Sequence, residues 1–138
     1  METYEIDLMD LNSSALVPVT VIQRESASTG DFILEVTVNG IPYQGVSEFF
    51  FPAFQLLRDE LLSVGYGMNC CGALLNAHQS PMMSVCDKVY LLTLGQKTLR
   101  KDMVCIFDPA TPENYPDTIH QNAFTEAWRR RLHSPAKD

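Results

Sequence analysis

Apolar and polar residues alternate along much of the first third of the chain, which is typical of strands with one buried face. Every second residue between 32 and 38 is a large apolar one, beginning with Phe32. Asn39-Gly40 follows directly and is a strong hairpin signal, so residues 41–45 are expected to return as a short strand. Residues 17–23 are rich in β-branched side chains and predict a further strand.

The period of the apolar residues changes from strand to helix after Ser47. The apolar positions that share one helical face are Phe50, Ala53, Phe54, Leu57, Leu61 and Val64. Ser47 is a plausible cap at the start of this helix, and Gly65 is a plausible stop at its end. Residues 1–12 mix acids with apolar residues, and we expect either an edge segment or a loosely held arm there.

The second half of the chain contains shorter apolar runs. Residues 88–94 are apolar at both alternating sets of positions, which predicts a strand near the centre of a sheet. Residues 103–107 predict another buried strand. Residues 66–75 are ambiguous, with a strand as one possibility, and residues 77–84 are expected to form a loop or a short helical turn.

A C-terminal helix is predicted to begin at Thr118, where Gln121 would complete a capping box. Its apolar stripe consists of Phe124, Trp128 and Leu132. The order of strands, helix, strands and helix predicts an α+β fold: a mostly antiparallel β-sheet with one central and one C-terminal helix packed on it.

The length and apolar content indicate one domain, residues 1–138, because 138 residues with 46% hydrophobic side chains suffice for a single core. No apolar run approaches the roughly 20 residues that a membrane-spanning helix needs. The acidic N-terminus lacks the cationic start of a secretory signal peptide. We therefore expect a cytoplasmic protein without a membrane partner.

Charge is distributed unevenly along the chain, whose formal net charge is −7. Residues 1–60 hold ten acidic residues against two basic ones, Arg24 and Arg58, a balance of −8. Residues 61–138 hold seven acidic against eight basic residues. An acidic first half repels nucleic acid and suits a partner with a basic surface. Solubility alone is the alternative explanation for this charge.

The stretch from Cys70 to Gln96 holds three of the four cysteines and also His78. A thiol enzyme would need a cysteine, a histidine base and an orienting group, but these residues stand in no recognisable signature. Zinc would need paired ligands such as Cys-x-x-Cys, which the sequence lacks. Reduced structural cysteines are the favoured interpretation.

Other candidate chemistry is weak as well. The chain has no glycine-rich phosphate loop and no paired-carboxylate signature. We therefore expect no catalytic residues, no metal and no cofactor. The pair Met82-Met83 and the run of three phenylalanines at residues 49–51 are interpreted as core or interface filler.

Residues 66–110 contain a series of short motifs. They are Gly72-Ala73, Asn76, Ser80-Pro81-Met82, Tyr90-Leu91-Leu92-Thr93-Leu94-Gly95 and Asp102-Met103-Val104-Cys105-Ile106-Phe107-Asp108-Pro109-Ala110. This series, about a third of the chain, resembles a family of small bacterial immunity proteins encoded beside polymorphic toxins, including Rhs-type toxins. Two positions depart from the family pattern: Cys105 stands in place of an acid, and Leu74-Leu75 in place of arginines.

The resemblance implies a bacterial immunity protein that binds a cognate toxin domain, in the setting of type VI secretion, and occludes its active site or substrate path. It implies no turnover and no cofactor, and the acidic charge adds the expectation of no nucleic-acid partner. Immunity proteins vary most where they meet their own toxin, so the acidic region before residue 60 is the expected contact surface. The candidate toxin-binding residues are Glu25, Asp31, Glu35 and Glu48, on or beside the first hairpin, with Asp59 and Glu60 in reserve. An adaptor or structural subunit and, less favoured, a Cys–His thiol enzyme are the alternatives.

Overall fold

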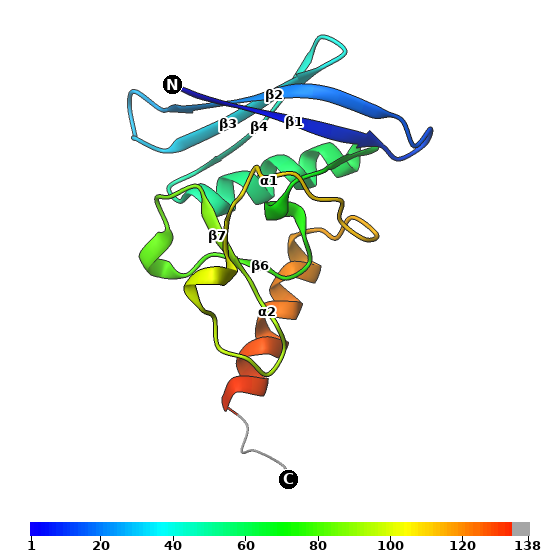
Figure 1. Ribbon diagram of the computed structural model, residues 1–138. Helices are drawn as coiled ribbons and strands as arrows, with labels where there is room; N and C mark the ends of the chain where they lie inside the picture. Colours follow the sequence, from blue (N-terminus) through cyan, green and yellow to red (C-terminus); the bar gives the residue numbers. More distant parts are fainter. Residues whose placement is uncertain (134–138) are drawn as a thin grey trace.

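The computed structural model describes residues 1–133 and has the predicted α+β fold, with a curled five-stranded antiparallel sheet above a helix and a smaller second half (Figure 1). The strands of the large sheet are β1 (Glu2–Asp10), β2 (Leu16–Glu25), β3 (Phe32–Val38), β4 (Ile41–Ser47) and β5 (Tyr66–Met68). Their order across the sheet is β4-β3-β2-β1-β5. The Asn39-Gly40 hairpin is confirmed, since Val38 pairs with Ile41 and both turn residues have positive φ.

One face of the large sheet is buried under helix α1 (Phe50–Ser63). The predicted apolar side of this helix is confirmed from Phe50 to Leu61, whereas Val64 is half exposed. Phe50 contacts Phe32 of the sheet edge-on, at 5.2 Å between ring centroids, and also Phe107, at 6.3 Å. These aromatic contacts join the sheet, the helix and the second half of the chain into one core.

Helix α1 can lie close to the edge strand β4 because residue 45 is a glycine. A Cβ atom at Gly45 would clash with the backbone oxygen of Ala53 and lie 2.6 Å from the backbone nitrogen of Leu57. The absence of a side chain therefore allows the helix backbone to rest directly on the strand.

The second half of the chain lies on the far side of α1 from the large sheet (Figure 1). It contains a three-stranded sheet of β6 (Ala77–His78), β7 (Lys88–Leu91) and β8 (Met103–Cys105), in the order β6-β7-β8. Three single 3₁₀ turns, Cys71–Ala73, Pro81–Met83 and Arg100–Asp102, connect these strands. Helix α2 (Thr118–His133) packs against α1 and β6.

A buried polar network fixes α2 to α1. Arg58 is 1% exposed, and its Nη2 donates to Gln121 Oε1 at 2.7 Å and to Thr118 Oγ1 at 3.1 Å. Gln121 is fully buried, and its amide nitrogen donates to the carbonyl oxygens of Gly72 at 2.9 Å and Leu74 at 2.7 Å. Two side chains thus connect both helices and the turn after β5 in a dry interior, where such bonds are strong.

Several sequence-based expectations about element boundaries are wrong. Residues 2–10 are not a loose arm, because β1 pairs with β2 along nearly its whole length. Only Leu8–Asp10 also pair with β5, so the first part of β1 is an edge segment and the last part lies inside the sheet. Only Tyr66–Met68 of the ambiguous segment forms a strand. The apolar strands predicted at 88–94 and 103–107 stop at Leu91 and Cys105.

Both predicted N-terminal helix caps differ from the structure, whereas the predicted stop is confirmed: Gly65 has positive φ and directly follows Val64, the C-cap of α1. Ser47 lies before the helix, where its hydroxyl accepts a hydrogen bond from the Phe49 backbone at 3.3 Å. Gln121 does not return to Thr118, because its side chain is committed to the buried network. The amide of Thr118 instead donates to Asp59 at 3.2 Å. The local cap of α2 is Asp117, whose side-chain oxygen Oδ1 accepts a hydrogen bond from the His120 backbone at 3.0 Å.

Replacing Gln121 with leucine should destabilise the fold strongly. The change removes the acceptor of a buried guanidinium and the donor to two backbone carbonyls, so the free energy of unfolding should fall by about 3 kcal/mol. The neighbouring Asn122 is exposed and offers a matched amide-to-leucine control, with an expected change within about 0.5 kcal/mol. Urea unfolding of both variants measures the difference, and equal midpoints would contradict a supporting role for the network.

Candidate functional site

Four acidic residues gather at one end of the large sheet, where β1 and β3 begin and β2 and β4 end. The strand register produces this arrangement, because Phe32 pairs with Glu25 on one side and with Ser47 on the other. The four residues, which we call the acidic end, are Glu2, Glu25, Asp31 and Glu48. Three of them belong to the predicted contact set, and Glu2 joins them because β1 is part of the sheet.

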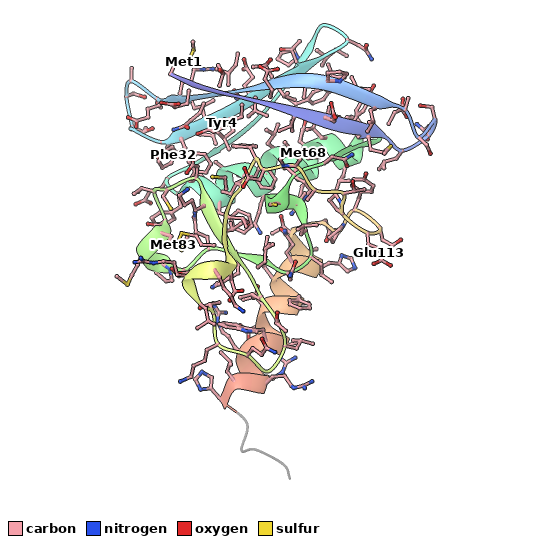
Figure 2. The ribbon with its side chains drawn as sticks, viewed as in Figure 1. Met1, Tyr4, Phe32, Met68, Met83 and Glu113 are labelled. Carbon is pink, nitrogen blue, oxygen red and sulfur yellow. The ribbon has the colours of Figure 1, made fainter. Side chains whose placement is uncertain are left out.

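Exposed apolar side chains lie next to the acidic end. Phe49 directly follows Glu48 and is 43% exposed, while Met82 is 96% and Val85 is 68% exposed. The Phe50 backbone nitrogen donates to the Ser84 carbonyl at 2.8 Å, which places residues 80–87 against the start of α1. We call Phe49, Met82 and Val85 the apolar patch. Met1, Phe32 and Met83 mark this side of the molecule, and Glu113 marks the opposite side (Figure 2).

The segment that carries most of the apolar patch is held in place by Gln79. Its side-chain nitrogen donates to the carbonyl oxygens of Cys86 at 2.7 Å and Lys88 at 2.9 Å. Its side-chain oxygen accepts from the Phe51 backbone at 3.3 Å. One residue thus ties both ends of the loop to helix α1, so Met82 and Val85 are presented on a fixed support.

A tyrosine connects the sheet to this loop beneath the acidic end. The Tyr4 hydroxyl lies 3.0 Å from Gln23 Oε1 and 3.3 Å from Asp87 Oδ2. Burial, followed by the negative charge of Asp87, raises the pKa of Tyr4 to about 12. Tyr4 therefore stays a neutral donor at physiological pH, which supports the contact between β1 and the loop.

The remaining three candidate acids lie elsewhere. Glu35 lies on the outer face of the sheet and forms an ion pair with Arg24 at 3.8 Å. Asp59 accepts hydrogen bonds from Arg58 Nε at 2.8 Å and from the Thr118 backbone, so it joins α1 to α2. Glu60 is exposed in the second half of α1, about 15 Å along the helix from Phe50 at 1.5 Å per residue. The structure thus brings together Glu25, Asp31 and Glu48 and separates the other three.

The cysteines and His78 do not form one cluster. Burial raises the pKa of Cys70 to about 12 and also raises the pKa of Cys71, so both remain thiols. Cys105 Sγ lies 3.3 Å from the Lys88 ammonium group. His78 instead packs on Trp128, with ring centroids 5.9 Å apart. Within residues 1–133, no hydrogen bond connects His78 to a cysteine.

Residues 1–133 contain no group of three or more His, Cys, Asp or Glu side chains arranged to hold a metal ion. No helix in this part of the chain is both long and apolar enough to cross a membrane.

Most of the motifs that carry the family resemblance take part in the packing of the second half of the chain. Gly72 allows Ile106 and Phe54 to approach its backbone, where a Cβ atom would lie 2.6 Å from the Ile106 side chain. Asn76 donates from its side chain to the carbonyl oxygen of Leu92 at 3.0 Å. Ile106 and Phe107 are buried in the core. These residues therefore serve the packing of the second half, whereas Met82 of the Ser80-Pro81-Met82 motif is exposed and belongs to the apolar patch.

Comparison of the sequence with models of known protein families gives no match, and comparison with curated proteins gives none either.

The sequence leaves open whether the phenylalanine run and Met82 fill the core or an interface. In the structure only Phe50 and Phe51 of the run are buried, whereas Phe49 and Met82 are exposed. Helical spacing does distinguish them, because Phe50 shares the apolar face with Phe54 and Leu57, whereas Phe49 precedes the helix. Met82 and Val85 lie in a loop without periodicity, so no local pattern determines their exposure.

The stability of the protein should depend on the protonation of His78. Burial, followed by the positive charge of Arg129, lowers the pKa of His78 below the ordinary value of 6.5. The unfolded chain binds this proton more readily than the folded chain does. The free energy of unfolding should therefore be highest above pH 6.5, decrease below it, and level off below the lowered pKa.

Urea unfolding at several pH values measures this dependence, and NMR titration of the imidazole measures the pKa directly. The His78→Gln variant should lose the part of the pH dependence that begins near pH 6.5. A His78 titration midpoint above 6.5 would contradict the assigned environment.

Proposed function

We propose that this protein is an immunity protein, which binds a cognate bacterial toxin domain stoichiometrically and blocks its active site or substrate path. The observation that carries the proposal is the acidic end beside the apolar patch, because an apolar centre with a charged rim is the usual anatomy of a protein interface. The resemblance of residues 66–110 to toxin-associated immunity proteins supports the choice of partner.

The charge of the acidic end indicates a basic partner surface. Glu2, Glu25 and Glu48 are exposed, and Asp31 is half-buried beside them. Carboxylates in this arrangement attract a basic protein and accelerate the encounter. The exposed side chains of Phe49, Met82 and Val85 then supply apolar area that the partner can bury. Encounter and residence thus depend on different residues of one surface.

The proposed inhibitor acts in the bacterial cytoplasm and needs neither a cofactor nor turnover. Cys70 and Cys71 have no role in the proposed mechanism, because both are buried thiols. Inhibition follows from occupancy alone, so protection should saturate at one immunity protein per toxin domain. An adaptor would bind the same partner and leave its activity unchanged.

Reversing the charge of Glu25 and Glu48 to lysine should slow association with the proposed cognate toxin domain. The two exposed carboxylates belong to the acidic end, so the rate should fall about tenfold or more at low ionic strength, with a shallower salt dependence. Stopped-flow association at several salt concentrations and survival of toxin-expressing cells are the measurements.

The matched control reverses Glu60 and Glu113, which changes the net charge equally. Both residues are exposed, and Glu113 lies on the side of the molecule opposite to Met83 (Figure 2). The control should retain most of the association rate and full protection. Equal rates for the two double variants would show that the acidic end does not guide docking, and binding without inhibition would identify an adaptor.

A further inference from the structure

A cavity of about 570 Å³ opens between the start of α1, the segment around β6, and α2. The apolar walls are formed by Phe49, the N-cap residue of α1, by Phe51 and Pro52 within α1, and by Pro81. Phe49 also belongs to the apolar patch, so the cavity continues the surface that we assign to the toxin. Its size falls within the usual range of binding pockets.

Three of the hydrogen-bonding side chains that line this cavity have no partner within residues 1–133. Thr125 is 7% exposed and lines the cavity, and within residues 1–133 its hydroxyl makes no hydrogen bond with another side chain or with the backbone. The side chains of Asn122 and Ser84 line the same space and likewise have no hydrogen-bond partner in the part of the chain described. An accessible, unpartnered hydroxyl on an otherwise buried residue of the cavity wall favours an occupant with a polar group at its tip.

The charges around the cavity balance one another. Arg129 Nη1 donates to Glu126 Oε1 at 2.9 Å, which leaves this ion pair without net charge. His78 is held in the neutral form at neutral pH by burial and by the charge of Arg129, which lower its pKa. An occupant with a full positive charge would approach Arg129 and would find only a carboxylate that is already paired.

We propose that this cavity receives a single aromatic side chain of the toxin, a tyrosine or a tryptophan, whose ring packs between Phe49 and Phe51 and whose polar tip reaches Thr125 and Asn122. The inference rests on the proposed function, because the partner that presents this side chain is the toxin domain. Tyrosine and tryptophan are the residues most enriched among the energetic anchors of interfaces, and anchors insert into preformed pockets.

The pocket can be tested without the toxin by titrating the protein with N-acetyl-L-tyrosinamide. Saturable NMR shifts should be confined to the amides of residues 49–55, 77–84 and 122–129. Trp128 is the only tryptophan, and its ring packs on His78, which lines the pocket. The fluorescence of Trp128 should therefore change over the same concentration range. N-acetyl-L-argininamide should produce no saturable shifts there.

A pair of neighbouring substitutions on α2 provides the control. Asn122→Trp places an indole over the cavity and should abolish the tyrosinamide shifts, whereas Ala123→Trp, at an exposed position outside the cavity, should leave them unchanged. With the toxin, Asn122→Trp should accelerate dissociation at least tenfold and Ala123→Trp should not.

The outcomes distinguish the inference from the proposed function. Shifts that do not saturate, that lie outside the pocket, or that are stronger for argininamide would overturn the aromatic assignment. If the toxin is still inhibited in those cases, the immunity function stands and only the pocket proposal fails. If tyrosinamide binds the pocket but the proposed toxin is not bound, the pocket exists and the assignment of its partner is wrong.

Discussion

The guanidinium group of Arg58 is buried in the interior between two helices, and the position of α2 depends on how its charge is satisfied. The Arg58 nitrogens Nε and Nη2 donate to Asp59, Thr118 and Gln121. The third nitrogen, Nη1, is the one buried side-chain nitrogen or oxygen in residues 1–133 that has no hydrogen-bond partner. Removing a partner from a buried charge is expensive, whereas a satisfied network is rigid. The contact between the two helices is therefore specific in register as well as in packing.

This network extends to the pocket and thereby to the proposed interface. Gln55 lines the cavity and donates to Gln121 Oε1 at 3.0 Å, so the same carbonyl oxygen serves both the buried guanidinium and the pocket wall. Gln79 also lines the cavity, and its hydrogen bonds hold the loop of Met82 and Val85 against α1. A rigid surface loses little conformational entropy on binding, which suits an inhibitor that must hold its target for a long time.

Local sequence signals predict the parts of the fold that local chemistry decides. The Asn39-Gly40 turn fixes the β3–β4 hairpin, and the spacing of Phe50, Phe54 and Leu57 identifies the buried side of α1. The burial of Arg58 has no such signal, since arginine is mostly exposed and its partner Gln121 lies 63 residues away. For the same reason Gln121 was assigned to a cap when its actual role is tertiary.

The candidate surface was predictable in part. Charge counting singled out the acids of the first half, and three of the six candidates meet at the acidic end because β2, β3 and β4 pair in one register. Counting cannot show that Asp59 is used inside the fold or that Glu35 faces Arg24. Charge counting also cannot show that residues 80–87 lie against α1 beside these acids. That contact is made by the side chain of Gln79 and by one backbone hydrogen bond between segments that are distant in the sequence.

Hydrogen–deuterium exchange of the protein alone and in complex with the proposed toxin partner tests the central claim most directly. The account predicts slower exchange on binding in residues 24–32, 47–51 and 80–87, which form the acidic end and the apolar patch, and no change in the loop of Glu113 on the opposite side. Protection confined to residues 111–117 or to the outer face of the large sheet would contradict it, because the toxin would then dock on a surface without the acidic end.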